Sequence, residues 1–366
     1  MSSSEARATK RLGASGASSS EARATNGLGA SGASSSEARA TNGLGASGAS
    51  PRFPFPIPNG WFAVAFGDEI ARGEVKPIRY FGEDLVLFRG EDDVARVFDA
   101  YCPHLGAHLG VGGRVEGDGL RCPFHGWRYD GSGRCAEVPY ARKVPPKARV
   151  RAWTTAEKNG LVMVWRHAEG AAPSYDVVDV PDYGSDAWTP PERREWFVRS
   201  CVQELAENSV DAAHFRFVHR TNTVPVTETA EIRGHQLHVI SHNVVSTPRG
   251  EQRGRIEIQA HGFGIGFTRF SGIADLLVVP CGTPIDADHT HMRLQFSVKK
   301  LPNSDATRGV GKAFIAEIER QFGQDIPIWE NKIHLEQPLL VEGEAPLALL
   351  RRWARQFYSG VEAGAA

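Results

Sequence analysis

The sequence predicts an α+β protein with two folded domains: a small all-β domain, followed by a larger domain of antiparallel strands and helices. Three observations support this fold class. Short apolar runs separated by Gly and Asp follow residue 50, and they are typical of strands. Longer strand-like runs fill the second half, with helical stretches before and after them. The 366 residues, 41% of them apolar, are enough to form two cores.

Residues 1–50 belong to neither predicted domain. Residues 2–49 hold three near-identical copies of one unit, SSSEARATKRLGASGA followed twice by SSSEARATNGLGASGA. Each copy has a single leucine and is rich in Ser, Ala and Gly, so it buries too little apolar surface to offset its chain entropy. We expect this segment to be disordered.

The first predicted domain covers residues 51–167. A proline-rich entry leads into three strand-like runs, WFAVAF, IRYFGEDLVLFRG and ARVFDAYC. GSGR at 131–134 predicts a turn, and LVMVWRH at 161–167 predicts a closing strand. Loops that are rich in Cys and His lie between them and are expected to cap the domain.

The second predicted domain covers residues 168–366. Residues 168–190 are rich in Pro and Asp and indicate a connector rather than a core element. Helices are expected near Gln203–Ala213 and at about Ala306–Phe322. In the second helix apolar residues recur at every fourth position, at Val310, Phe314, Ile318 and Phe322. The strand-like runs between the helices are HQLHVISHNVV, RIEIQAHGFGIGFTRFSG, ADLLVVPCGTPI and HMRLQFSVKK.

The composition argues against several partners and locations. With 42 basic and 43 acidic residues the net charge is −1, which gives no electrostatic reason to expect nucleic acid as a partner. The five cysteines show no disulfide pattern, so a reduced, cytoplasmic location is expected. No apolar run approaches the roughly 18 residues of a transmembrane helix, and we expect neither a membrane span nor a secretory leader.

Two matched Cys/His pairs lie in the loops of the first domain. Cys102 with His104 forms C-x-H, and Cys122 with His125 forms C-x-x-H. Two thiolates and two imidazoles can bind either zinc or an iron–sulfur cluster. A zinc finger usually places its histidines together at the end of the motif. A Rieske [2Fe–2S] centre takes two cysteines and two histidines. The pattern therefore favours a Rieske cluster, with a structural zinc site as the alternative.

The segments CPHLGAHL and CPFHGWRYDGSGRC resemble the N-terminal half of a Rieske non-haem iron oxygenase. The resemblance covers about residues 58–358. It implies a Rieske domain followed by a helix-grip catalytic domain with a mononuclear Fe(II) site. Within these oxygenases the chain most resembles the steroid-acting group, which contains bacterial 3-ketosteroid 9α-hydroxylases and Neverland-type cholesterol 7-desaturases. CPHLGAHLGVGGRV, GRCAEVPYARKVP and GLVMVW resemble the desaturase branch, and DIPIWENK with RRWARQFY fits both branches. The N-terminal repeats and the lack of an animal-type membrane segment depart from that group.

The stretch ELAENSVDAAHFRFVH carries the candidate iron site. Asp211 and His214 are three residues apart and would share one face of a helix. His219 lies five residues after His214, so the helix must end and the chain must fold back. Fe(II) that activates O2 is typically held by two histidines and one carboxylate, which makes His214 and His219 candidate ligands.

The third iron ligand must be an acidic residue from elsewhere in the chain. FGQDIPIWENK resembles the segment that supplies it in the family, which implies Asp325, with Glu330 as the fallback. Asp286 and Asp288 are explained by turn chemistry between two strands, and Asp305 by a helix start.

Asn208 and Asp211 complete the candidate catalytic residues. In the family the aspartate that matches Asp211 bridges an iron-ligand histidine and a Rieske histidine of the neighbouring subunit. The resemblance therefore implies a homotrimer in which Asp211 links His214 to His125 of another chain. The alternative is a supporting role, in which the Asp211 carboxylate accepts the outer N–H of a ligand histidine.

No G-x-G-x-x-G opens a strand–helix unit, so NAD(P)H is expected to act only through a separate reductase or ferredoxin. The resemblance implies the oxygenase component of a monooxygenase or desaturase system, which uses O2 to oxidise a sterol or steroid and is most like cholesterol 7-desaturase. Two alternatives remain open. One is an oxygenase that hydroxylates or demethylates another apolar or aromatic substrate, and the other is a Rieske ferredoxin-type electron carrier. Candidate pocket residues, which ordinary core packing would equally explain, are Ile265, Phe267, Phe270 and Leu276.

Overall fold

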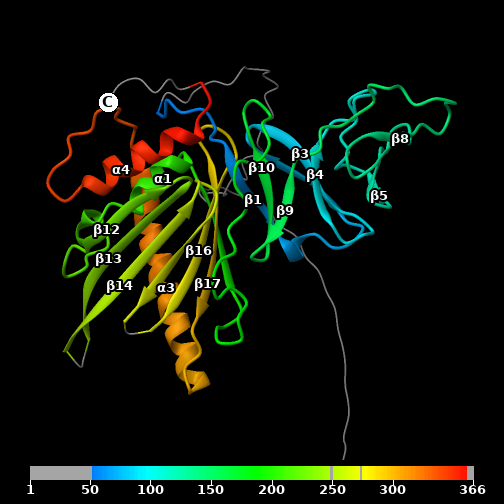
Figure 1. Ribbon diagram of the computed structural model, residues 1–366. Helices are drawn as coiled ribbons and strands as arrows, with labels where there is room; N and C mark the ends of the chain where they lie inside the picture. The colour runs from blue at the N-terminus through cyan, green and yellow to red at the C-terminus, as the bar shows by residue number, and fades with distance from the viewer. Residues whose placement is uncertain (1–51, 248–249, 273, 361–366) are drawn as a thin grey trace, which may run out of the picture. The chain divides into compact units, whose positions relative to one another are not determined.

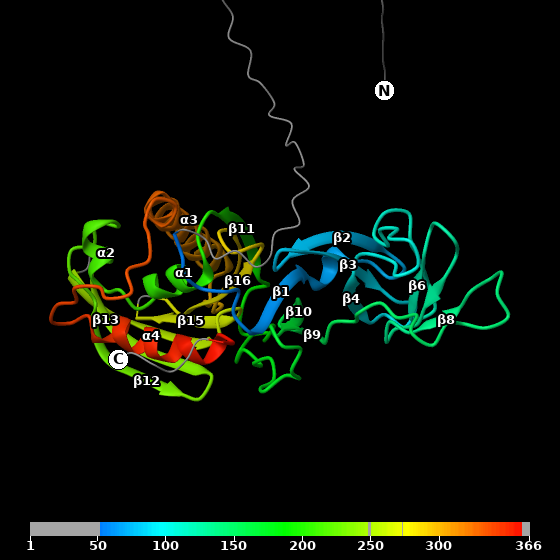
Figure 2. The same ribbon diagram turned by 90° about the horizontal axis from the view of Figure 1, so that it is seen from above.

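The computed structural model describes residues 52–247, 250–272 and 274–360 (Figures 1 and 2). The repeats at 1–50, predicted to be disordered, lie outside these described residues. Three small antiparallel sheets come first in the chain, and one seven-stranded antiparallel sheet with helices follows. The α+β prediction is confirmed.

The first domain is built from short strands. Sheet order is β1-β10-β9, β2-β3-β4 and β5-β6-β7-β8. The predicted closing strand is confirmed, because β10 pairs with β1. The strands are β1 (Gly60–Phe66), β2 (Val75–Tyr80), β3 (Glu83–Arg89), β4 (Ala95–Asp99), β5 (Arg114–Glu116), β6 (Gly119–Arg121), β7 (Arg128–Tyr129), β8 (Cys135–Glu137), β9 (Thr155–Lys158) and β10 (Leu161–Arg166).

The large sheet has the order β11-β17-β16-β15-β14-β13-β12. Its strands are β11 (Glu192–Val198), β12 (Val226–Arg233), β13 (Gln236–Thr247), β14 (Gly250–His261), β15 (Gly266–Ser271), β16 (Leu276–Pro284) and β17 (Thr290–Val298). GFGIG was expected inside one strand-like run, but the chain turns there between β14 and β15. The turn begins at Gly262, whose φ of +67° lies in the left-handed region that favours glycine.

Within its described residues the second domain has four α-helices: α1 (Val202–Asn208), α2 (Ala213–Phe217), α3 (Ser304–Trp329) and α4 (Ala345–Ala354). The prediction of one helix over Gln203–Ala213 was wrong. The Ser209 hydroxyl donates to the carbonyl oxygen of Ala206 at 2.6 Å where α1 ends, and the Asp211 carboxylate accepts the Ala213 N–H where α2 begins. The second predicted helix is confirmed, but α3 continues beyond Phe322 and carries Asp325.

The sheet buries both of its faces. Val278 of β16 packs in the core that includes Phe322 of α3, while its neighbours Leu277 and Val279 pack in the core that includes Trp61 of β1. Figure 1 shows α3 running behind the sheet. The segment 168–190, predicted to be a connector outside the core, contributes Val177, Val180 and Trp188 to the core around β1.

A buried arginine joins β1 to the large sheet. Arg293 of β17, 4% exposed, donates to the carbonyl oxygens of Ala63 at 2.9 Å and Val64 at 3.1 Å, and to the Tyr80 hydroxyl at 2.7 Å. The Thr283 hydroxyl donates to the Ala63 carbonyl at 2.6 Å. The register of β1 with β10 shifts at this point, so the large sheet satisfies carbonyls that the bulge exposes.

Candidate active site

Two similar loops present the Cys/His pairs of the first domain. One follows β4 and the other follows β6. The Gly106 N–H donates to the Cys102 carbonyl at 2.9 Å, and the Gly126 N–H donates to the Cys122 carbonyl at 3.1 Å. Both glycines have φ near +75°, at +75° and +72°, where a side chain would be strained. The loops therefore place their four predicted ligands in matching positions, at Cys102, His104, Cys122 and His125.

These side chains form one pair of thiols and one pair of imidazoles. Cys102 and Cys122 are both buried and lie within hydrogen-bonding reach of each other. The rings of His104 and His125 are 4.7 Å apart between centroids. The Tyr129 hydroxyl lies 3.0 Å from the Cys102 sulfur.

This arrangement fits a two-iron cluster better than a single zinc ion. A zinc ion requires all four donors around one point. In the part of the chain that the structure describes, two groups of three His, Cys, Asp or Glu residues converge within 4.8 Å, and neither is this one. Nδ1 of His125 is buried without a hydrogen-bond partner among the described residues, as expected for an atom that needs a metal. Separate thiol and imidazole pairs suit a [2Fe–2S] cluster in which the two cysteines bind one iron and the two histidines bind the other.

The structure brings the three predicted iron ligands together. His214 lies on α2, His219 follows that helix, and Asp325 lies on α3, and their ligand atoms all fall within 4.8 Å of one another. Nε2 of His219 is 3.4 Å from the Asp325 carboxylate. The amide nitrogen of Asn208 lies 3.3 Å from Nε2 of His214 and 3.3 Å from the Asp325 carboxylate. It therefore lies beside the point at which the three ligand atoms converge.

Both histidines are oriented through their outer nitrogens. Nδ1 of His214 donates to the backbone carbonyl of Asp211 at 2.6 Å, and Nδ1 of His219 donates to the Gln324 side-chain oxygen at 3.1 Å. The nitrogen nearest to the shared point is therefore Nε2 in each ring. The carboxylate of Asp211, predicted as the supporting acceptor, lies 3.8 Å from His214 Nδ1 and instead accepts the Ala213 N–H. No sequence signal pointed to Gln324.

Burial disfavours the charged forms of the His214, His219 and Asp325 side chains. Burial lowers the pKa of both His214 and His219. It also raises the pKa of Asp325 to about 7, opposed by the Asn208 hydrogen bond and assisted by the Asp211 charge. Two neutral imidazoles and a carboxyl that ionises near neutral pH fit a divalent cation, and this donor set suits Fe(II) with positions open for O2.

Two other acidic candidates have different partners. Glu330, the fallback ligand, caps the end of α3 and accepts the Arg199 N–H at 3.3 Å. A second group of three, Glu204, Glu207 and His334, also converges. Lys332 pairs with Glu204 at 2.5 Å and Arg351 with Glu207 at 2.9 Å. These cations balance the carboxylates, so this group does not require a metal.

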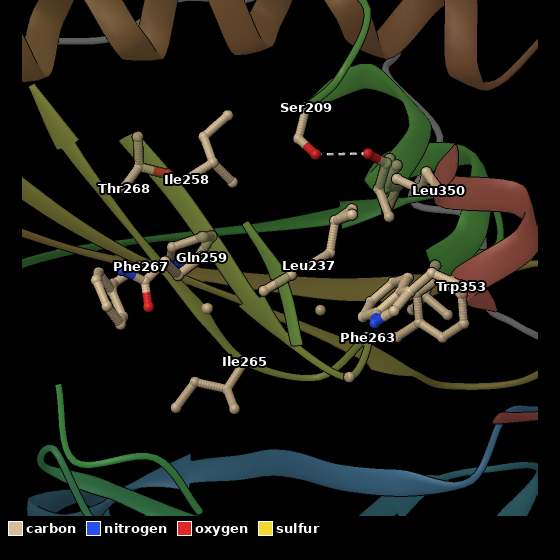
Figure 3. Close-up of a pocket in the computed structure, with 18 of the residues that line it drawn as sticks. Ser209, Leu237, Ile258, Gln259, Phe263, Ile265, Phe267, Thr268, Leu350 and Trp353 are labelled. Atoms are coloured by element: carbon tan, nitrogen blue, oxygen red, sulfur yellow. Dashed lines mark hydrogen bonds between the residues drawn. The ribbon is translucent and has the colours of Figure 1, made fainter. Parts of the chain in front are cut away.

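An apolar cavity lies between α1, α4 and the large sheet (Figure 3). It extends from Ser209, directly after Asn208, across Leu237 and Ile258 to Thr268. Ile265 and Phe267, two of the predicted pocket residues, line it. Phe270 packs on Phe314 of α3 instead, and Leu276 belongs to the sheet without lining the cavity.

Comparison with known proteins identifies both halves of the chain. Residues 60–153 match the Rieske [2Fe-2S] domain family, and residues 164–358 match the 3-Ketosteroid 9alpha-hydroxylase C-terminal domain family. A 3-ketosteroid-9-alpha-monooxygenase oxygenase component of Rhodococcus rhodochrous is 34% identical over 319 residues, which cover 83% of this chain and 82% of that protein. The chain belongs to this family of Rieske oxygenases.

The chain is also similar to a curated cholesterol 7-desaturase and, in its fold, to two solved structures. Cholesterol 7-desaturase nvd of Xenopus laevis is 31% identical over 331 residues, covering 82% of this chain and 72% of that protein. The solved structure of NdmB from Pseudomonas putida CBB5 has a TM-score of 0.67 at 19% identity, covering 81% of this chain and 89% of that one. Dicamba monooxygenase bound to dicamba has a TM-score of 0.64 at 17% identity, covering 82% and 97%. The two solved structures show the shared fold.

Membership in this family decides between several predictions. The enzyme is an oxidoreductase that uses a Rieske cluster, mononuclear iron and O2, so the ferredoxin and zinc alternatives are excluded. In residues 52–247, 250–272 and 274–360, no helix is both long and apolar enough to cross a membrane.

Proposed function

We propose that this Rieske oxygenase hydroxylates or desaturates a steroid or sterol, with electrons from NAD(P)H delivered by a separate reductase. The observation that carries the proposal is the apolar cavity, which begins one residue after Asn208 and is lined by aliphatic and aromatic side chains. The names of the relatives support the substrate class, since both the 9α-monooxygenases and the 7-desaturases act on the steroid skeleton.

We assign the cofactor sites to the residues that the loops and helices bring together. The cluster is held by Cys102, His104, Cys122 and His125. The iron is held by His214, His219 and Asp325, and when bound it supplies the site at which O2 is activated. Asn208 orients the Asp325 carboxylate by donating to it, and α1 keeps Asn208 next to the cavity.

The cavity must expand to admit a substrate with four rings. Its volume of about 120 Å³ is below the roughly 300–1,000 Å³ of typical small-molecule sites. Met292 lines it beside Gly282, and a methionine side chain adapts readily to a new neighbour.

Two exposed apolar surfaces support a homotrimer in which electrons pass between chains. Leu105 and Phe124 are exposed on the loops that carry His104 and His125. The second surface surrounds a cavity of about 370 Å³ that reaches Asp211, His214 and Asp325. Its exposed residues include Phe217, Ile333, Leu335 and Leu339. Contact between the two surfaces on neighbouring copies would place His125 beside Asp211 and cover apolar area that a monomer leaves in water.

The domain division and the location complete the proposal. We assign residues 51–167 to the Rieske domain and residues 168–366 to the catalytic domain. We propose a cytoplasmic location, which the cysteines support because none of the five is in a disulfide.

The experiment that tests the proposed function is turnover of a panel of sterols, 3-ketosteroids and aromatic acids with a surrogate reductase. Products are identified by mass. We expect a steroid product that has gained one oxygen or lost two hydrogens. Turnover of the aromatic acids alone would replace the steroid assignment with the aromatic one.

Thr268 is expected to recognise an oxygen atom of the substrate. In the register of the sheet Thr268 pairs with Ile258, so both side chains face the cavity. The Ser209 hydroxyl is already bonded to Ala206, as the dashed line in Figure 3 shows, whereas the Thr268 hydroxyl has no partner among the described residues. Thr268→Val should raise KM about tenfold for a keto- or hydroxysteroid, the value of one hydrogen bond. A steroid hydrocarbon without that oxygen serves as the control, and equal effects on both substrates would contradict this role.

Tyr129 is expected to raise the reduction potential of the cluster. Its hydroxyl lies 3.0 Å from the Cys102 sulfur, and a hydrogen bond to a thiolate stabilises the reduced state. Tyr129→Phe should lower the potential by roughly 40 mV, which corresponds to about 1 kcal/mol for one electron. A redox titration followed by EPR measures it, and a potential within 10 mV of the wild type would show that the hydroxyl is not a donor.

A further inference from the structure

One segment of the Rieske domain has a marked excess of positive charge. Residues 114–151 contain nine Lys or Arg and four Asp or Glu, a net charge of +5. The whole chain has a net charge of −1, so the remaining residues sum to −6. The net charge of the whole chain does not reveal this uneven distribution of charge.

Part of this charge has no partner among the residues that the structure describes. Arg142, Lys143, Lys147 and Arg149 are all exposed. Among the residues that the structure describes, none of their side chains makes a hydrogen bond or an ion pair. Most other basic residues of the segment do form such pairs: Arg121 with Glu116 and Glu137, and Arg151 with Glu83. The unpaired charges therefore remain available to a partner.

Two of these side chains, Lys147 and Arg149, line a cleft of about 790 Å³. Its charged lining residues, Arg134, Lys147 and Arg149, are all basic. Val144, Pro145 and Pro146 supply an apolar strip between them, and two consecutive prolines limit how far this loop can move. A stiff apolar strip edged by positive charge has the character of a protein docking surface rather than a small-molecule site.

The floor of this cleft leads to the thiol side of the cluster site. Cys135 lines the cleft and is paired with Tyr129 across β7 and β8. The Tyr129 hydroxyl touches the Cys102 sulfur, and all three residues share one core with Ala148. His104 and His125 lie on the loops that expose Leu105 and Phe124, which the proposed trimer covers. Access from the cleft therefore reaches the cluster from the cysteine side.

We propose that this basic cleft is the docking site of the electron donor, an acidic one-electron redox protein. This inference rests on the external electron supply in the proposed function. At each encounter the donor is oxidised by one electron and the cluster is reduced by one. Two encounters supply two electrons, and two protons are taken up with them. The substrate supplies the other two electrons, so O2 yields one product hydroxyl and one water in hydroxylation, or two waters in desaturation. The cluster then has an entrance on its cysteine side and an exit at His125.

The test is a charge reversal in the holoenzyme, Lys147→Glu with Arg149→Glu. The probe is an acidic plant-type [2Fe–2S] ferredoxin. Its Kd is measured by titration calorimetry and the rate of cluster reduction by stopped flow, at low and at high salt. We expect Kd to rise at least tenfold at low salt and to lose most of its salt dependence. Carbodiimide should cross-link Lys147 of the wild type to a ferredoxin carboxylate, as identified by mass spectrometry.

The matched control is Arg253→Glu with Lys312→Glu, an equal change of charge at exposed positions of β14 and α3. Its Kd should stay within twofold of the wild type. Dithionite should reduce the cluster equally in all proteins. If the charge reversal harms folding, Lys147→Gln with Arg149→Gln takes its place and should raise Kd by less than the reversal. Equal loss in both reversal variants, or wild-type binding by the cleft variant, would overturn the docking site. Failure of reduced ferredoxin to reduce the wild type would instead contradict the external electron supply, and no substrate is needed for either result.

Discussion

Replacing Asp325 with asparagine is expected to remove iron from the catalytic domain and to lower turnover by more than about 1,000-fold, because one of the three proposed protein ligands loses its charge. Asparagine keeps the size of the side chain and its contact with Asn208. The cluster should remain, since its ligands lie in other loops. Iron analysis and the EPR spectrum of the reduced cluster measure the two sites separately.

Glu330→Gln is the matched control for this variant. Glu330 lies five residues further along, at the end of α3, and contacts Arg199 rather than the histidines. We expect full iron content and activity. Iron loss in Glu330→Gln with retention in Asp325→Asn would reverse the assignment of the third ligand.

The same substitution should stabilise the iron-free protein. The pKa of Asp325 is raised from 3.8 to about 7 by burial, so the folded protein binds more protons than the unfolded chain between these values. The free energy of unfolding therefore falls as pH rises from about 4 to 7. We expect Asp325→Asn to remove this loss and to be more stable at pH 8 by roughly 2–3 kcal/mol, allowing for screening by water in the adjoining cavity. Denaturant unfolding at pH 4 and pH 8 measures the difference, which should vanish at pH 4.

Replacing Asp211 with asparagine should slow electron transfer to the iron at least 100-fold while both metal sites stay occupied. His214 donates to the backbone carbonyl of Asp211, and asparagine retains this carbonyl. Its side-chain oxygen can also accept the Ala213 N–H that the carboxylate now accepts. Only the negative charge is lost, which the proposed trimer places between His214 and His125 of a neighbouring chain. Rapid mixing of O2 with the pre-reduced enzyme follows cluster oxidation directly.

Asp211→Ala provides the comparison, because it also removes the acceptor of the Ala213 N–H at the start of α2 and should cost about 1 kcal/mol of stability. If asparagine supports wild-type electron transfer and alanine does not, the side chain serves as a cap alone. Iron loss in the asparagine variant would mean that the carboxylate, rather than the carbonyl, holds His214.

The parts of the site that could be predicted from sequence are those with ligands close together in the chain. Cys102 and His104, or His214 and His219, are a few residues apart, so spacing alone indicates that they can meet. Asp325 is 111 residues from His214, and it was implied by family resemblance rather than by periodicity. Gln324 and the carbonyl of Asp211 gave no signal, because backbone and amide acceptors are chosen by the packing of α2 against α3.

The fold was predictable where apolar periodicity is strong. β10 and the start of α3 follow their patterns closely. β12, the edge strand Val226–Arg233, was missed because polar Thr and Glu make up half of it. The break between α1 and α2 was missed because it depends on two side-chain contacts, from Ser209 and Asp211, that compete with the helix.

The short helix α1 contributes side chains to two cavities, one for the substrate and one beside the iron site. Evolution can therefore change substrate binding and generation of the oxidant independently. Val202, Leu205 and Ala206 line the apolar cavity, while Glu204 and Glu207 line the cavity that reaches His214 and Asp325, two of the proposed iron ligands. A library of substitutions restricted to the first set should therefore diversify the molecules that are oxidised without altering how the oxidant is generated. Such a partition within two helical turns gives a lineage the freedom to acquire new substrates while its redox machinery stays unchanged.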